Sequence, residues 1–249
     1  YAPPTVESTS PSNGEVNVPV NTNITIIFSE PINKLSAIGN ITIEPFVEIE
    51  YYIWSNNNKT LTLILLSNLS SYTNYTVTIT TNVKDLSQNS FQEPYQFSFR
   101  TKDVTPPIAN AGDDKGVKED IGGELNASLS WDNQGITNRT WSFVDQGNTV
   151  LLYGETVYYT FVQPGYYVIT LNISDAAGNW AVDIVNITVK DVTLPVISNV
   201  QANPKIQEVY GYVNITVFIS DNVLVNAVCV NIVYPNGTPL GNFSMIGIE

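Results

Sequence analysis

The feature that most constrains this chain is a one-by-one alternation of apolar and polar residues, which recurs in short segments along its length. An alternation with period two places apolar side chains on one face of a strand and polar side chains on the other. Turn-forming residues separate the segments about every 8–12 residues, as in a β-sandwich, and helix signals are nearly missing. We therefore predict an all-β protein. The clearest segments are 24–28, 61–65, 75–79, 167–173, 185–189 and 213–219.

Two junctions of nearly identical sequence divide the chain. The first junction, residues 102–107, reads Lys-Asp-Val-Thr-Pro-Pro, and the second junction, residues 190–195, reads Lys-Asp-Val-Thr-Leu-Pro. Each follows one predicted strand and precedes another. Proline stiffens such a linker and cannot pair across it. We predict three tandem units joined by short proline-containing linkers, at residues 1–102, 103–190 and 191–249.

The third unit is short. Residues 191–249 offer about four strands, too few to close a sandwich alone. We expect this unit to continue beyond Glu249 or to be completed by a neighbouring chain. Because the sequence starts abruptly at Tyr1, we also expect a fragment or a processed segment.

The composition excludes several function classes. The chain has no His and one cysteine, Cys229, which removes Ser–His–Asp and Cys–His catalysis, His-ligated metals and internal disulfides. Because those catalytic residue sets are missing, we predict no enzyme activity. The net charge of the chain is −13 and its basic residues are scattered, so we also predict no nucleic-acid partner. No apolar run is long enough for a membrane span. We expect Cys229, in an apolar run, to be a buried or half-buried side chain.

The first unit resembles a known family. Segments 10–14 (Ser-Pro-Ser-Asn-Gly), 28–31, 72–77, 85–89 (Asp-Leu-Ser-Gln-Asn) and 97–101 occur in the order found in bacterial Ig-like domains of S-layer and adhesin proteins. The resemblance spans the whole unit and implies an Ig-like β-sandwich.

The second unit resembles a PKD domain. The matching segments are 141–143 (Trp-Ser-Phe), 159–161 (Tyr-Thr-Phe), 164–171 and 175–179 (Asp-Ala-Ala-Gly-Asn). One departure is the turn at residues 144–147, Val-Asp-Gln-Gly, where the family usually has an acidic, Gly-rich turn.

The third unit is similar, over part of its length, to Ig-like repeats of archaeal surface proteins, through residues 220–223 and 234–238. Together the resemblances imply tandem Ig-like sandwiches that serve outside the cell as spacers, adhesion modules or lattice units. Such tandem modules with Asp-x-Thr-x-Pro junctions are common in archaeal cell-surface glycoproteins.

Acceptor motifs for N-glycosylation are in excess. Chance placement of the Asn, Ser and Thr residues predicts roughly five Asn-x-Ser/Thr motifs, and the chain has twelve. We predict covalent N-glycans, while the alternative is that Asn and Thr are simply the polar partners of a strand face. The acceptor residues are Asn23, Asn40, Asn58, Asn68, Asn74, Asn126, Asn138, Asn172, Asn186, Asn214, Asn236 and Asn242.

Calcium is the one cofactor that the residues suggest. Ca²⁺ takes several oxygen ligands, and Asp103, Asp175 and Asp191 lie where domains would meet. No EF-hand spacing exists, and the alternative is that these residues form turns through Asx hydrogen bonds. The candidate ligands fall into two sets, one of Asp103, Asp113, Asp114, Asp132 and Asn133, and the other of Asp175, Asn179, Asp191 and Asp221.

Two other groups of residues could serve either a functional or a purely structural role. Glycosidases need two carboxylates, but we interpret the groups 44–50 and 113–120, which contain Glu44 and Glu119, as solvated loops or faces. The aromatic residues of segment 51–54 form either a strip for stacking sugars or part of a core.

These observations favour a heavily N-glycosylated structural component of an extracellular surface layer or filament, with copies of itself as partners. One alternative is an adhesion or carbohydrate-binding module. Another is the non-catalytic stalk of a secreted hydrolase.

Overall fold

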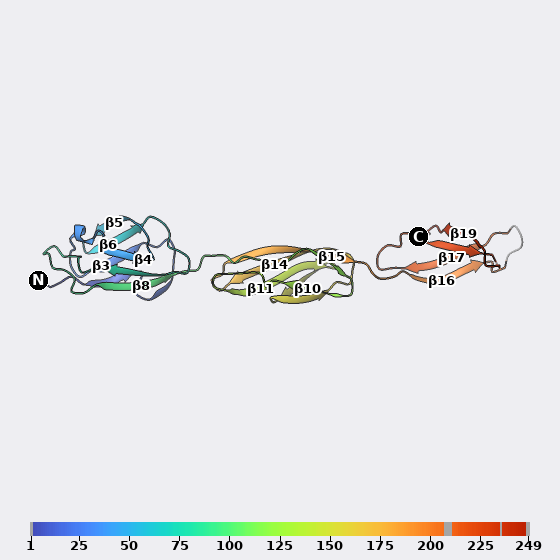
Figure 1. Ribbon diagram of the computed structural model, residues 1–249, viewed down its shortest axis with the longest axis horizontal. Helices are drawn as coiled ribbons and strands as arrows, with labels where there is room; N and C mark the ends of the chain where they lie inside the picture. Colours follow the sequence, from blue (N-terminus) through green and yellow to red (C-terminus); the bar gives the residue numbers. More distant parts are fainter. Residues whose placement is uncertain (1, 207–210, 235, 248–249) are drawn as a thin grey trace. The chain divides into compact units, whose positions relative to one another are not determined.

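The computed structural model describes residues 2–206, 211–234 and 236–247, and strands dominate it throughout (Figure 1). Tyr1, Pro235 and Glu249, which fall within the segments discussed above, lie outside the described residues. The predicted all-β class is confirmed. The packing divides the chain into two compact units. The first comprises residues 1–107, 132–135 and 175–179, and the second comprises 108–131, 136–174 and 180–249.

The first sandwich has two four-stranded sheets. Its first sheet has the order β1 (Val6–Ser10), β3 (Ile24–Phe28), β6 (Thr60–Leu65) and β5 (Ile49–Ser55). Its second sheet has the order β2 (Glu15–Val18), β8 (Tyr95–Thr101), β7 (Asn74–Ile79) and β4 (Ile41–Glu44). A short helix, α1 (Lys34–Ala37), begins where the Asn33 side chain accepts a hydrogen bond from the Leu35 amide.

The core of the first sandwich follows the alternation in the sequence. Ile24, Ile26 and Phe28 of β3 are fully buried, and the side chains between them are half-buried. Burial of one such side chain contributes about 1.5–3 kcal/mol. In β5 the same alternation separates the aromatic residues. Trp54 stacks on Phe28 with ring centroids 6.2 Å apart, whereas Tyr51 points to solvent, so segment 51–54 forms no continuous aromatic strip.

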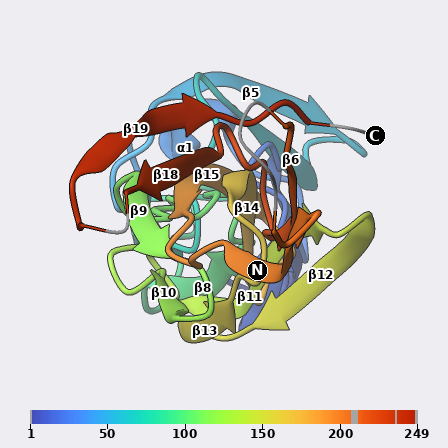
Figure 2. The same cartoon turned by 90° about the vertical axis from the view of Figure 1, so that its right-hand side faces the viewer.

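The second sandwich pairs a five-stranded sheet with a two-stranded one. The large sheet has the order β12 (Asn148–Tyr153), β11 (Ile136–Asp145), β14 (Gly165–Asp175), β15 (Trp180–Lys190) and β9 (Lys115–Lys118). The small sheet joins β10 (Gly122–Asn126) to β13 (Thr156–Thr160), which lie side by side in Figure 2. Trp141 is fully buried between the sheets, and its indole nitrogen donates to the Gly154 carbonyl at 3.1 Å.

The turn that departs from the PKD pattern contains a buried acid. Asp145 accepts hydrogen bonds from the hydroxyls of Tyr159 at 2.7 Å and Tyr167 at 3.1 Å. The hydrogen bond to Asp145, together with burial, raises the pKa of Tyr159 to about 12. Gln146 and Gly147 then turn the chain with positive φ angles of 49° and 76°. This carboxylate is therefore satisfied by phenol donors inside the sandwich.

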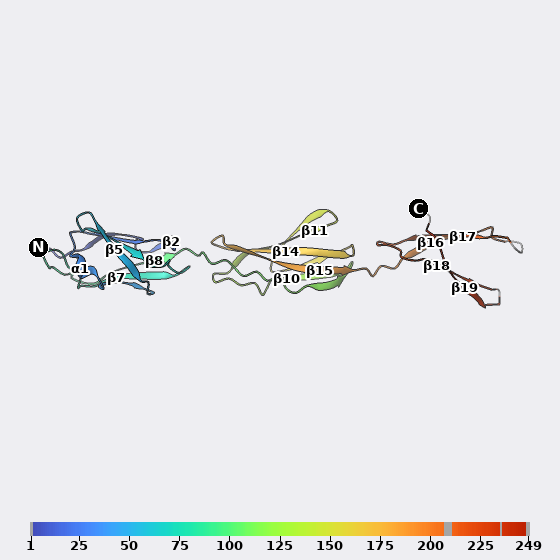
Figure 3. The same cartoon turned by 90° about the horizontal axis from the view of Figure 1, so that it is seen from above.

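The remaining residues form two separate hairpins. One pairs β16 (Val196–Asn203) with β17 (Asn214–Ser220), and the other pairs β18 (Cys229–Val233) with β19 (Pro239–Ser244), as Figure 3 shows. Among the described residues after 190, none is buried. The expectation of a buried or half-buried Cys229 is wrong: its side chain is exposed, because β18 pairs with β19 in a two-stranded sheet that no other described strand covers. The three-unit division remains a prediction.

Candidate functional site

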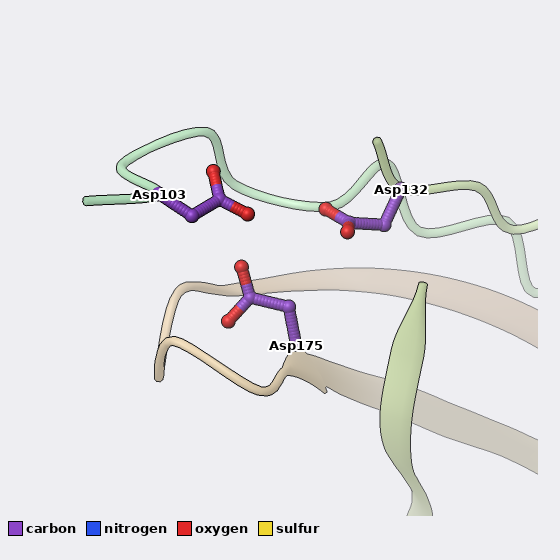
Figure 4. Close-up of side chains that lie close together, drawn as sticks. All are labelled: Asp103, Asp132 and Asp175. Atoms are coloured by element: carbon purple, nitrogen blue, oxygen red, sulfur yellow. The ribbon is translucent and has the colours of Figure 1, made fainter. Parts of the chain in front are cut away.

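Three carboxylates from distant parts of the sequence meet at one point (Figure 4). Asp103 lies in the first junction just after β8, Asp132 lies in the loop between β10 and β11, and Asp175 is the last residue of β14. One oxygen of each lies within 4.8 Å of the others. The residues are 4%, 8% and 4% exposed, respectively. We call these three residues the aspartate cluster.

Asp103 is held by a local turn and by a second segment. Its Oδ1 accepts hydrogen bonds from the Thr105 amide at 3.0 Å and from the Ser71 hydroxyl at 2.8 Å. The Asn133 amide nitrogen lies 3.4 Å from the same oxygen. Burial raises the pKa of the Asp103 carboxyl, but the hydrogen bonds from Thr105, Ser71 and Asn133 outweigh burial and leave the pKa below its ordinary value. Asp103 is therefore ionised at neutral pH.

Asp175 and Asp132 are also oriented by nearby amides. The hairpin after β14 closes where the Asn179 backbone and side-chain nitrogens donate to the two Asp175 oxygens, at 2.8 and 2.7 Å. Asp132 Oδ2 accepts from the Gln134 amide at 2.7 Å. The backbone pairing of Ile108 with Trp131, the residue just before Asp132, fixes the start of this loop.

Two oxygen atoms beside the cluster have no hydrogen-bond donor. Asp132 Oδ1 and Asn133 Oδ1 are buried and unpartnered within the described structure. The one ion pair found among the described residues joins Arg139 to Glu155, so no Lys or Arg neutralises the three carboxylates. Buried charge is costly unless it is paired. The cluster is thus rich in oxygen ligands and lacks a counter-charge.

The second junction holds its acids in another way. Asp191 Oδ1 accepts from the Thr193 amide at 3.0 Å, as Asp103 does from Thr105. Glu119 is 1% exposed and accepts from Val192 N at 2.8 Å, from Thr193 N at 2.7 Å and Oγ1 at 2.6 Å, and from Asn222 Nδ2 at 2.5 Å. The interpretation of Glu119 as a solvated loop residue is therefore wrong, because donors distant in the sequence surround it.

These contacts shift the pKa values of the two acids at the second junction in opposite directions. The Thr193 hydroxyl and the Val192 amide lead the hydrogen bonds that lower the pKa of Glu119 to about 2. Burial, together with the neighbouring Glu119 and Asp221 charges, raises the pKa of Asp191. Within the described ranges, Asp191 belongs to no group of three carboxylates like the aspartate cluster.

The other candidate oxygen donors serve turns and strand ends. Asp114 accepts hydrogen bonds from the Asn186 backbone and side chain at 2.8 and 2.9 Å. Asp221 accepts from the Val223 amide at 2.9 Å in an Asx turn. Glu44 and Glu48 line a surface depression of about 290 Å³, where Thr42 and Tyr52 are the other residues with polar side chains.

None of the twelve acceptor asparagines is buried. Asn40, Asn58, Asn126 and Asn186 are half-buried. The side-chain nitrogens of Asn40, Asn126 and Asn186 donate to Ser36 O, Glu124 Oε1 and Asp114 Oδ2, respectively. The other nine make no such bond with any described residue, so their amide nitrogens are free for attachment of a sugar. They are Asn23, Asn58, Asn68, Asn74, Asn138, Asn172, Asn214, Asn236 and Asn242.

Family models match most of the chain. Residues 1–101 match the model described as a bacterial Ig-like domain, and residues 104–189 match that of a PKD domain. The chain carries a bacterial Ig-like domain followed by a PKD domain. Asp103 lies between the two matched ranges, whereas Asp132 and Asp175 lie within the PKD domain. Both domains are non-catalytic module types.

Two solved structures are similar to this chain at low identity. The IG1+IG2 structure of DIP-gamma is 13% identical, with a TM-score of 0.48, and the match covers 76% of this chain and 99% of that one. The N-terminal part of the bacterial S-layer protein SbsC is 17% identical, with a TM-score of 0.33, and the match covers 76% of this chain and 45% of that one. These low values give no basis for carrying over a partner or an assembly.

Two further observations concern relatives and membranes. Comparison with curated protein sequences gives no significant match. Within the described ranges, no helix has the length and hydropathy that a membrane crossing requires.

Proposed function

We propose that this chain is a heavily N-glycosylated structural component of an extracellular surface layer or filament. In this proposal, the bacterial Ig-like and PKD domains act as spacers and assembly units, and copies of the same chain are the partners. The pairing of two module types that occur in surface proteins supports this location. An archaeal origin belongs to the same proposal and rests on the sequence resemblance alone.

The observation that carries the proposal is the placement of the acceptor asparagines. All twelve lie outside the cores, and nine have an uncommitted amide nitrogen. Only 13% of the residues are charged, so sugars would supply solubility that charge does not. Glycans on open sheet faces would also shield edge strands from unwanted pairing.

The test is electron microscopy of the native surface material combined with intact-mass and glycopeptide analysis. We expect an ordered lattice or filament whose subunit is far heavier than its polypeptide alone. Glycopeptide analysis should find higher sugar occupancy at the nine uncommitted asparagines than at Asn40, Asn126 and Asn186. A dispersed monomer of unmodified mass would contradict the proposal.

Adhesion or carbohydrate binding is the second candidate function. It is favoured by the depression at Glu44 and Glu48, where Phe46 is 79% exposed beside Tyr52. An exposed aromatic ring beside carboxylates suits sugar binding. A glycan array without signal would count against it. The stalk of a secreted hydrolase remains a prediction, which sequencing of the whole gene tests.

A further inference from the structure

We propose that Asp103, Asp132 and Asp175 bind a calcium ion. The site goes beyond the proposed structural role, because it does not depend on glycosylation or on assembly. The ion would tie the first junction to two loops of the PKD domain, residues 132–135 and 175–179, which pack with residues 1–107 in one compact unit.

The first argument is charge. Three carboxylates with oxygens within 4.8 Å of one another repel strongly when they are shielded from water. Such a group must take up protons or a cation, because leaving buried charges unpaired is costly. No Lys or Arg of the described chain neutralises it.

The second argument is the unpartnered oxygen of Asp132. Asp132 is only 8% exposed, and its buried Oδ1 accepts no hydrogen bond from any described residue. In Figure 4 the Asp132 carboxylate points toward those of Asp103 and Asp175. Most buried polar atoms in proteins have a hydrogen-bond partner. A water molecule would satisfy this oxygen without cancelling the charge, whereas a divalent cation does both.

The third argument is ligand chemistry. The cluster offers carboxylate oxygens, and the neighbouring Asn133, whose Nδ2 lies 3.4 Å from Asp103 Oδ1, also has a buried and unpartnered amide oxygen. The cluster contains no nitrogen or sulfur ligand, which argues against zinc and copper. Ca²⁺ accepts 6–8 oxygens in flexible geometry, including amide oxygens and waters, whereas Mg²⁺ requires a near-ideal octahedron. Ca²⁺ is therefore the cation that fits this set.

The test is isothermal titration of Ca²⁺ into the full chain after treatment with EDTA. We expect one site, with a Kd of about 10⁻³ M or tighter, as in other extracellular modules. Tb³⁺ luminescence is an independent probe of the same site, with Trp131, the residue before Asp132, as the indole to excite. Asp132→Asn should weaken binding at least about 100-fold, since one charged ligand is lost from a set of three.

Asp85→Asn is the matched control. Asp85 is equally buried, at 1% exposed, and its oxygens accept from the Asn89 backbone and side chain at 2.8 and 2.6 Å, as Asp175 accepts from Asn179. It lies outside the aspartate cluster, so this variant should bind Ca²⁺ as the wild type does.

Thermal melts keep the test independent of folding defects. In EDTA, Asp132→Asn should melt at or above the wild-type temperature because repulsion is relieved, and in Ca²⁺ it should melt below the wild type. The proposal is overturned by an absence of binding at millimolar Ca²⁺, by unchanged binding in Asp132→Asn, or by Mg²⁺ binding as tightly as Ca²⁺.

Discussion

The two junctions begin with the same four residues, yet the structure surrounds them differently. In each, the aspartate accepts a 3.0 Å hydrogen bond from the threonine amide two residues later. At the first junction, Asp103 then faces two more carboxylates, one with an unpartnered oxygen. At the second junction, Asp191 neighbours Glu119, which accepts four hydrogen bonds. A shared local motif therefore leaves open how its charge is balanced: by a cation at the first junction, as we propose, and by N–H and O–H donors at the second.

The largest effect should follow removal of the acceptor at the second junction. Glu119→Ala leaves the Val192 and Thr193 amides, the Thr193 hydroxyl and the Asn222 amide without their partner. A backbone amide that loses its hydrogen-bond acceptor is no longer protected from exchange, so we expect hydrogen exchange at Val192 and Thr193 to accelerate at least about 100-fold. Added Ca²⁺ should not restore protection.

The control for this variant is Asp120→Asn, which changes the exposed neighbouring acid and keeps a residue that tolerates its positive φ of 58°. Exchange in Asp120→Asn should match the wild type. If Glu119→Ala leaves protection at residues 192–193 intact, hydrogen bonding by Glu119 does not hold the second junction.

Acidification should spare the second junction until very low pH. Because the folded-state pKa of Glu119 is about 2 and its ordinary value is 4.5, its stabilising contribution is present above about 4.5 and is lost as the pH falls toward 2. Asp191, whose pKa is raised, takes up its proton first, which relieves its repulsion from Glu119. The chemical shift of the Val192 amide, which donates to Glu119 and not to Asp191, should therefore change with a midpoint near 2. A midpoint near 4.5 would show that the donors do not stabilise the Glu119 carboxylate.

The smallest effects should come from single hydroxyl donors. Ser71→Ala removes one donor to Asp103, and Thr193→Val removes one donor to Glu119. Each should cost about 0.5–1.5 kcal/mol of stability, read from denaturant unfolding. The two variants should differ in their response to calcium: Ser71→Ala should change Ca²⁺ affinity a few-fold, and Thr193→Val should leave it unchanged. Equal responses would remove the distinction between the junctions.

The sequence predicted the features that depend on local periodicity. Strands such as β3 and β7 follow the alternation because burial on one face imposes a period of two. The same logic failed at Cys229, since an apolar run predicts burial only where a second layer covers the strand. The alternation of β5 also separated Tyr51 from Trp54, as a core role for Trp54 requires.

The site was only partly predictable. Asp103 and Asp175 were candidate calcium ligands from sequence, and Asp132 was a nearby donor, but their meeting depends on where three loops end in space. Glu119 was missed because its donors lie more than seventy residues away along the chain. No local pattern marks such a buried acid. Asp191 carries the same motif as Asp103, and only its neighbours distinguish them.

The most direct test is hydrogen exchange of the full chain, measured by mass spectrometry with Ca²⁺ and with EDTA. If a cation holds the first junction and hydrogen bonds hold the second, Ca²⁺ will slow exchange in peptides covering residues 103–105 and 132–134. Exchange at residues 192–193 will then be the same in both conditions. If Ca²⁺ changes exchange at neither junction, or slows it equally at both, the proposed difference between the two junctions is contradicted.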